Sequence, residues 1–150
     1  MASKRDQIKL TEEELRTLLD EEKVVTCATI GPNGRPHLMP LWFVAEDGPV
    51  LRGWTYAKSQ KTKNLERDPH ATLQIETGVE YQELRGAMME CDVEVVREGV
   101  VDFGTALFAR YAPGVDVGEM ISQQAPKRVG LVFTPTRIVT WDHRKLGGGY

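Results

Sequence analysis

Near the start of the chain, apolar residues recur among polar ones with the period of an amphipathic helix. Three leucines recur at spacings of three and four residues within residues 11–22, the pattern of a helix with one buried face. Thr11 is followed three residues later by Glu14, which forms a capping box at the helix start. The pattern therefore predicts a short helix from Thr11 to about Glu22.

The apolar residues then fall into short runs bounded by turn residues, which is typical of strands. The predicted strands cover residues 24–30, 37–45, 50–55, 71–76, 83–96, 128–133 and 137–141. Turns are expected at 31–34, 46–48 and 134–136, where glycine, proline and polar residues gather. We expect the first three strands to form a meander, and Gly86 to place a bend or bulge in the long fifth strand.

Three further helices are predicted, over residues 59–67, 101–111 and 117–124. The first of them must end before Pro69, because the residue preceding a proline disfavours helical geometry. Strands that follow one another with tight turns predict a mainly β (α+β) domain, a small antiparallel barrel with short flanking helices. No Gly/Ser-rich linker divides residues 1–150, so we expect a single domain. No glycine-rich turn of a dinucleotide fold follows the first strand.

The net charge limits the classes of partner that the protein is expected to bind. A net charge of -3 argues against general binding to nucleic acid or to an anionic membrane. No apolar run approaches the roughly 20 residues of a membrane span. Residues 1–6 are polar and lack the apolar segment of a signal peptide, so we expect a cytoplasmic location.

The cysteines and histidines do not suggest a metal site. Cys27 and Cys91 lie far apart in strand-like runs and are expected to be two buried thiols. Together with three scattered histidines they match no zinc-ligand spacing. His143 lies in a mixed aromatic and charged tail at 141–145, which is either a polar strand end or a functional segment. No catalytic residue is identified.

A cluster of cations stands where the third strand passes into a helix. Lys58, Lys61 and Lys63 lie there together with the hydroxyls of Thr55 and Ser59. A helix start carries free N–H groups and partial positive charge, so it favours anions. The segment is therefore a candidate phosphate site, and the alternative is a solvated helix face.

A second candidate is the apolar run that contains Met39, Pro40 and Leu41. Pro40 has no N–H, so it must interrupt the strand ladder or lie on an edge strand. Backbone groups left free there suit a flat heterocycle, although a strand with one bulge explains the same residues.

The order of these features resembles a known family. The strand at 24–30, the turn at 31–36, the segment Arg52-Gly53-Trp54-Thr55 and the run 58–65 resemble pyridoxamine 5'-phosphate oxidase-like split β-barrels. The resemblance covers roughly residues 10–141 and is strongest to small actinobacterial oxidoreductases that use flavin or the deazaflavin coenzyme F420. It implies a six- to seven-stranded, Greek-key-like antiparallel split β-barrel, and a homodimer with cofactor sites between the subunits.

The resemblance also implies roles for particular residues. The segment from Lys58 to Lys63 would bind the cofactor phosphate, with Lys58, Ser59 and Lys61 as its main contacts. The residues implied to border the cofactor ring and its ribityl chain are Met39, Pro40, Leu41 and Trp54. Tyr81 matches a position that the partner subunit offers to the site.

The resemblance implies an oxidoreductase that transfers a hydride from reduced F420 to a conjugated small molecule such as an enone, a quinone or a tetrapyrrole. Three lysines with Arg52 and Arg67 suit the long anionic tail of F420 better than a single phosphate. The alternatives are an FMN-dependent reductase or oxidase, and a carrier that binds F420 or haem without turnover. The chain lacks the arginine-rich phosphate segment of the oxidase proper, which argues against oxidation of pyridoxamine phosphate.

Overall fold

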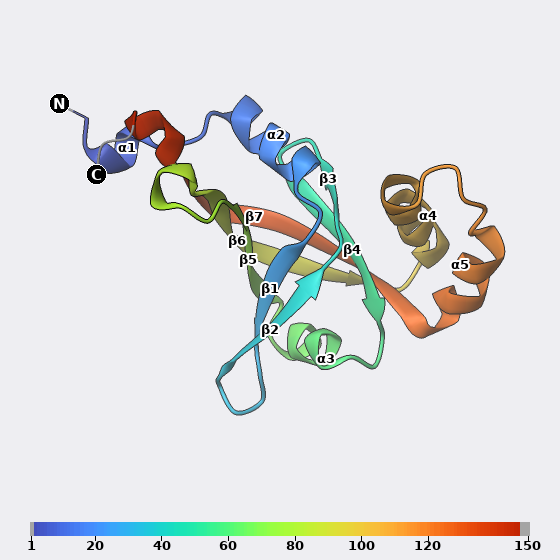
Figure 1. Cartoon of the computed structure of the whole chain (residues 1–150). Coiled ribbons are helices and arrows are strands. Elements are labelled where there is room, and N and C mark those ends of the chain that lie inside the picture. The colour runs from blue at the N-terminus through green and yellow to red at the C-terminus, as the bar shows by residue number, and fades with distance from the viewer. Residues whose placement is uncertain (1, 148–150) are drawn as a thin grey trace.

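The protein is built on one curled antiparallel sheet, seen in a computed structural model that describes residues 2–147 (Figure 1). Seven strands follow one another in the order β2-β1-β5-β6-β7-β4-β3. The sheet curls into a half-barrel, and short helices flank it. This confirms the predicted mainly β (α+β) fold with seven antiparallel strands.

Each predicted strand region is extended in the structure, with some changes at the ends. The strands are β1 (Val25–Ile30), β2 (Pro36–Leu41), β3 (Val44–Glu46), β4 (Val50–Tyr56), β5 (His70–Thr77), β6 (Arg85–Val96) and β7 (Arg128–Asp142).

The predicted helices are also present, and short helices that were not predicted occur near both termini and just before β6 and β7. The α-helices are α1 (Lys4–Gln7), α2 (Glu12–Glu21), α3 (Gln60–Arg67), α4 (Val100–Tyr111) and α5 (Gly118–Gln124). The 3-10 helices are η1 (Tyr81–Glu83), η2 (Ala125–Lys127) and η3 (His143–Leu146). Within residues 2–147, every helix is too short or too polar to span a bilayer.

The first four strands form two hairpins at opposite ends of the sheet. β1 pairs with β2 at one end, and β3 pairs with β4 at the other. The expected meander is therefore wrong, because the chain leaves β2 after Leu41 and crosses to the far edge. Phe43, buried at the crossing, fixes this path by packing into the core. Pro40 lies on edge strand β2, as its missing N–H requires.

The last two strands form a long ribbon with a register shift, which does not lie at the predicted position. The register shifts between Glu90 and Cys91, where Pro135 lies opposite Cys91. The two strands expected on either side of 134–136 are consequently one bulged strand, β7. Gly86 keeps regular register opposite Trp141, so no bulge lies there. A Cβ at Gly86 would approach the Trp141 ring to 2.5 Å, so close packing explains this glycine.

The hydrophobic core fills the curl of the sheet and is closed on one side by α2. The capping box of α2 is formed as predicted, with the Glu14 N–H donating to Thr11 Oγ1 at 3.1 Å and the Thr11 N–H donating to Glu14 Oε1 at 2.9 Å. The three leucines of this helix are buried. Cys27 and Cys91 are buried free thiols, as the sequence predicts.

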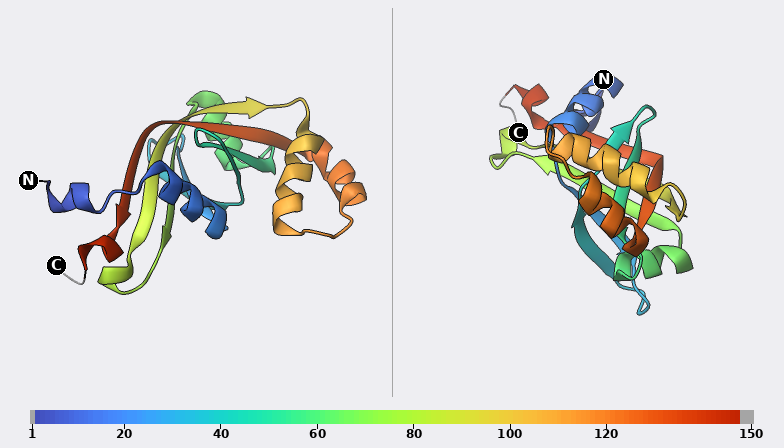
Figure 2. Two further views of the ribbon diagram at one scale, coloured as in Figure 1. Left: turned by 90° about the horizontal axis from the view of Figure 1, so that it is seen from above. Right: turned by 90° about the vertical axis from the view of Figure 1, so that its right-hand side faces the viewer.

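Helices α4 and α5 form a separate layer at one end of the sheet. They lie at the right of Figure 1 and of the left view of Figure 2, and toward the viewer in the right view of Figure 2. Arg110 ties α4 to the rest of the molecule. Its guanidinium donates to the carbonyl oxygens of Phe43 at 2.6 Å, Leu19 at 2.7 Å and Glu22 at 2.9 Å. Since the Leu19 and Glu22 oxygens lie at the end of α2, this contact also caps that helix.

Candidate functional site

A groove of about 530 Å³ lies where β2, β4, α3, α4 and the start of β7 meet. Its volume falls within the range of small-molecule sites, which is roughly 300–1,000 Å³. The residues that line it are Val24, Pro40, Leu41, Trp42, Trp54, Thr55, Lys61, Leu107, Phe108 and Arg128. They come from β2, β4, α3, α4 and β7, together with Val24 before β1 and Trp42 after β2, so only the folded chain creates this groove.

Lys61 places a buried cation in the groove. Its side chain follows the start of α3 and is only 7% exposed. Within the described part of the chain, its hydrogen-bond partner is the Thr55 hydroxyl, 3.2 Å from Nζ, and it takes part in no ion pair. Burial lowers the pKa of Lys61; the nearby Cys27 thiol opposes this shift, and the charge of Arg128 lowers the pKa further. A buried ammonium without a counter-ion favours the binding of an anion.

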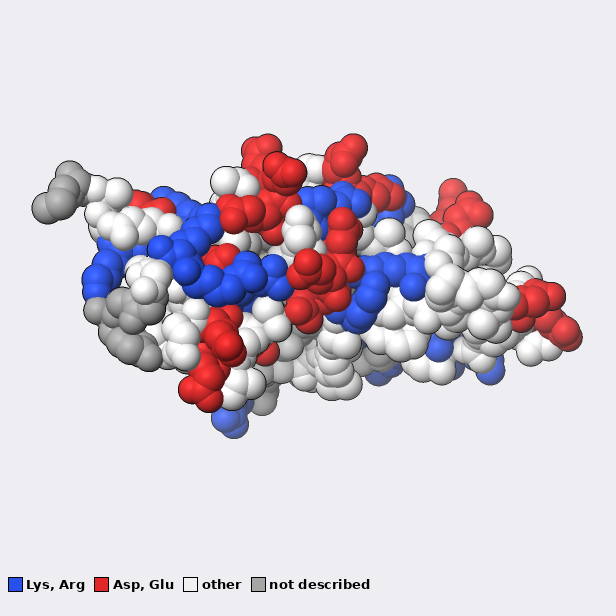
Figure 3. Space-filling model, turned by 45° about the horizontal axis from the view of Figure 1, so that its top comes forward, with Lys and Arg blue, Asp and Glu red and all other residues white. Residues whose placement is uncertain are grey.

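Several surface cations of the protein, unlike Lys61, lie beside acidic side chains. On the face drawn in Figure 3, Lys and Arg side chains lie among Asp and Glu side chains. Arg52, for example, forms an ion pair with Glu46 at 2.8 Å. Arg67 donates to the carbonyl oxygen of Ile30. Neither arginine lines the groove, so the sequence argument that they favour a long anionic tail is not supported.

The strand–helix junction is held by its own hydroxyls. Ser59 is the N-cap of α3, and its Oγ accepts from the Thr62 N–H at 3.2 Å. The Thr62 hydroxyl donates to the Tyr56 carbonyl oxygen at 2.8 Å. These bonds set the direction of the first helical turn and thereby aim Lys61 back toward Thr55.

The three lysines of the junction lie in different places. Lys61 alone faces the groove with Thr55. Lys58 and Ser59 line a second hollow of about 610 Å³, together with Tyr56, Ala57, Pro126 and Lys127. Lys63 is exposed on α3 and lines neither. The reason is that Ser59 is the N-cap: Lys58 precedes the helix, while Lys61 and Lys63 project from it in different directions.

Only some of the residues predicted to border the cofactor ring line the groove. Pro40, Leu41 and Trp54 line the groove, whereas Met39 is exposed on edge strand β2 and does not. Tyr81 lies in η1, at the end of the sheet away from α4.

Tyr81 contacts the C-terminal segment rather than the groove of its own chain. Its ring centroid is 4.6 Å from that of His143, whose Nδ1 lies 2.8 Å from the Tyr81 carbonyl oxygen. Because a carbonyl oxygen only accepts, this nitrogen carries the proton. The tail at 141–145 therefore fixes η1, which is a structural role for a segment that the sequence left open.

An aromatic wall closes the other side of the groove, and its residues Phe108 and Tyr111 were not predicted. Trp42 is 45% exposed and stacks on Tyr111, with ring centroids 4.4 Å apart and an interplanar angle of 10°. Phe108 meets Trp42 and Trp54 edge-on, at 6.2 Å and 5.9 Å. Such a wall offers ring faces and edges to a planar ligand.

Arg128 is a further groove residue that sequence reasoning missed. It is the first residue of β7 and lies opposite Tyr56 in the β4–β7 register. That register joins segments more than 70 residues apart, and no local pattern reveals it.

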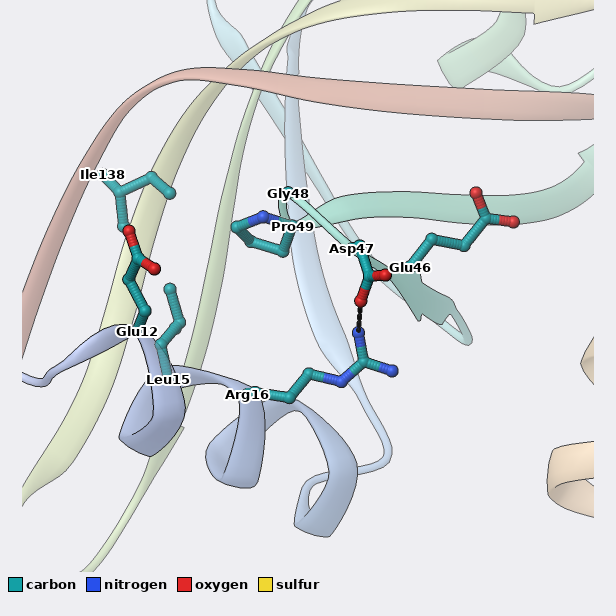
Figure 4. Close-up of a pocket in the computed structure, with 8 residues that line it drawn as sticks. All are labelled: Glu12, Leu15, Arg16, Glu46, Asp47, Gly48, Pro49 and Ile138. Atoms are coloured by element: carbon teal, nitrogen blue, oxygen red, sulfur yellow. Dashed lines mark ion pairs between the residues drawn. The ribbon is translucent and has the colours of Figure 1, made fainter.

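A smaller hollow of about 240 Å³ lies between α2 and the β3–β4 turn (Figure 4). Its arginine, Arg16, points toward the Asp47 carboxylate, 3.8 Å away, and also pairs with Asp20 at 3.3 Å. Because this cation already has acidic partners, the hollow lacks the unpaired charge found at Lys61.

The half-barrel sheet with a groove at its side defines the protein as a split β-barrel. The chain belongs to the pyridoxamine 5'-phosphate oxidase family, whose sequence profile matches residues 11–142. The comparison with curated proteins gives no match.

Solved structures with the same fold include proteins of several kinds. Conserved hypothetical protein Rv2991 from Mycobacterium tuberculosis is 37% identical, with a TM-score of 0.89 over 99% of this chain and 95% of that one. A protein described as an F420 reductase is 26% identical, with a TM-score of 0.65 over 85% of this chain and 98% of that one. HutZ, a haem storage protein from Vibrio cholerae, is 17% identical, with a TM-score of 0.66 over 86% and 94%. At that identity HutZ shows the fold alone.

Proposed function

We propose that the protein is an oxidoreductase that binds coenzyme F420 in the groove and transfers a hydride from the reduced coenzyme to a conjugated small molecule. The observation that carries the proposal is the Lys61 ammonium, buried in a groove of ligand size without an acidic partner among residues 2–147. The 26% identity to an F420 reductase supports this coenzyme over FMN.

The groove residues fit such a cofactor. Lys61 and Thr55 offer a cation and a hydroxyl to a phosphate, since charged donors bind phosphate oxygens strongly. Pro40, Leu41 and Trp54 offer an apolar border for a tricyclic ring. The coenzyme would supply the hydride chemistry, and the protein would supply binding and orientation.

The chain's own contribution is positioning and the exclusion of water. Leu41, Leu107 and Phe108 make the groove wall apolar, and such a wall strengthens the electrostatic interactions inside it. Trp42 is held by its stack on Tyr111 and presents an aromatic surface to an electron-poor planar substrate, such as an enone, quinone or tetrapyrrole. No side chain is assigned as proton donor, and water serves in that role in this proposal.

We also propose that the protein acts as a homodimer. Edge strand β2 and its flanks expose apolar side chains, among them Leu38 at 60% exposure and Met39 and Ile30 nearby. A second copy that covers this edge would bury them and protect unpaired backbone groups. Light scattering on the purified protein measures this, and a monomer at micromolar concentration would contradict it.

The function itself is tested by binding and turnover measured together. F420 and FMN are titrated side by side by fluorescence, and reduced F420 is then mixed with a panel of enones and quinones. Tight F420 binding with oxidation of the reduced coenzyme supports the proposal. A yellow protein that retains FMN and ignores F420 indicates the FMN-dependent alternative, whereas F420 binding without oxidation across the panel indicates a carrier.

A further inference from the structure

Arg128 is held in the groove by aromatic rings. Its guanidinium carbon lies 3.6 Å from the centroid of the Tyr56 ring and 4.7 Å from that of Trp54. Cation–π contacts of this kind hold a guanidinium in place and leave its N–H donors unused. Arg128 is therefore fixed in position without being neutralised.

The donors of Arg128 lack partners among residues 2–147. Its Nε is buried and has no hydrogen-bond partner among the described residues. Residues 2–147 also provide it with no ion pair, in contrast to Arg97, which meets Glu66 at 2.6 Å, and Arg144, which meets Asp142 at 2.8 Å. A buried donor without an acceptor is costly, so a ligand acceptor would bind favourably here.

Arg128 and Lys61 line the same groove. Each positive charge makes the other less favourable, and Arg128 contributes to the lowered pKa of Lys61, although burial is its main cause. The two cations are a guanidinium with a planar set of donors and an ammonium with three donors. Together they suit an anion with several oxygens and more than one acceptor direction, which describes a phosphate group.

We propose that Arg128 is a second anion-binding residue that acts with Lys61 on the phosphate of the bound cofactor. This inference rests on the proposed function. It adds a residue from β7, the strand paired with β4, to a phosphate site that the sequence places only at the β4–α3 junction. Cofactor affinity then depends on the β4–β7 register, which brings Arg128 beside Tyr56.

The test compares ligands with and without the phosphate. FMN and riboflavin differ only in this group, whereas the deazaflavin without the phosphate also lacks the anionic tail of F420, so affinities are measured for both pairs. The proteins are the wild type, Arg128→Gln, Arg128→Lys and Lys127→Gln. Lys127 is the matched control, since it is the adjacent cation and lines the second hollow. Circular dichroism and the melting temperature show whether each variant folds.

We expect Arg128→Gln to lower the affinity ratio of phosphate-bearing to phosphate-free ligand by about 10- to 100-fold. Arg128→Lys should retain part of the preference for the phosphate-bearing ligand, and Lys127→Gln should leave the affinity ratio unchanged. An unchanged affinity ratio, including equal weakening of both ligands, overturns the inference. If Arg128 served only to pack against Trp54 and Tyr56, its loss would weaken both ligands equally. If wild-type protein binds neither cofactor, the proposed function itself fails, which is a distinct result.

Discussion

Trp42 and Tyr111 stack almost parallel, with ring centroids 4.4 Å apart. The stack joins the crossing after β2 to the end of α4, two segments that enclose the groove. The Tyr111 hydroxyl reinforces this contact by accepting from the Phe43 N–H at 3.0 Å and donating to the Lys23 carbonyl oxygen at 2.7 Å. Burial raises the pKa of Tyr111, so the hydroxyl remains a donor at neutral pH.

Replacing Tyr111 with phenylalanine should destabilise the protein by about 1–3 kcal/mol, because the ring remains while its backbone partners lose their hydrogen bonds. The free energy of unfolding, measured by urea denaturation, checks this. Tyr56→Phe is the matched control, since the Tyr56 ring is half exposed and lies on Arg128. Its effect should stay within about 0.5 kcal/mol. Equal effects of the two substitutions would show that the Tyr111 hydroxyl is unimportant.

Gly86→Ala should destabilise the protein by about 1–3 kcal/mol, the usual cost of overpacking. The added Cβ would meet the Trp141 ring at 2.5 Å and the Ile75 carbonyl oxygen at 2.7 Å. Backbone on one side and a large ring on the other leave little room to adjust. Gly118→Ala is the control, because its nearest neighbour is the Asp116 carboxylate at 3.6 Å. A shift of the unfolding midpoint in Gly118→Ala as large as that in Gly86→Ala would argue against the close-packing explanation.

The sequence predicts local elements well and their arrangement only in part. The capping box of α2, the N-cap serine of α3 and the edge position of Pro40 follow from residue chemistry alone. The crossing from β2 to β3 does not, because Phe43, Arg110 and Tyr111 fix it through contacts between segments far apart in sequence. The bulge in β7, opposite Glu90 and Cys91, is likewise set by the pairing with β6.

The candidate site shows the same division. Lys61 and Thr55 are predictable, since the strand–helix junction brings them together over six residues. Lys58 and Lys63 are separated from Lys61 because Ser59 caps the helix. The position of the N-cap thus decides which lysine faces the groove. Arg128 comes from β7, and Phe108 and Tyr111 of the aromatic wall come from α4. Only the long-range register and helix packing place these three residues around the groove.

Asp142 should give the protein an acid-sensitive contact. Its carboxylate is buried and accepts from the Arg144 Nε at 2.9 Å and from Nη2 at 2.8 Å. These bonds hold the pKa of Asp142 below its ordinary value of 3.8. A depressed folded-state pKa adds stability that is present above the unfolded value and is lost as pH falls through the folded value.

Asp142→Asn should therefore lower the free energy of unfolding at pH 7 by about 1–3 kcal/mol, and the difference from wild type should shrink as the pH falls below 3.8. Denaturation at a series of pH values measures it. Asp20→Asn serves as control, because the Asp20 carboxylate is exposed and pairs with Arg16 on the surface. A difference between Asp142→Asn and wild type that is independent of pH would contradict the assignment.

Lys58 and Lys61 line different hollows, so single substitutions separate their roles. Lys58→Gln should weaken F420 binding much less than Lys61→Gln, because Lys58 is exposed beside Ser59 and its charge is already solvated. Fluorescence titration of each variant measures this. A larger loss in Lys58→Gln would place the phosphate in the second hollow instead.

The most direct test of the account is the affinity of F420 for wild type, Lys61→Gln and Lys63→Gln, measured by equilibrium fluorescence titration at one ionic strength. Both substitutions remove one positive charge from α3, but only Lys61 is buried in the groove. We predict a loss of about tenfold or more for Lys61→Gln and an affinity close to wild type for Lys63→Gln. Equal affinities in the two variants would contradict the assignment of Lys61 as the buried anion-binding residue.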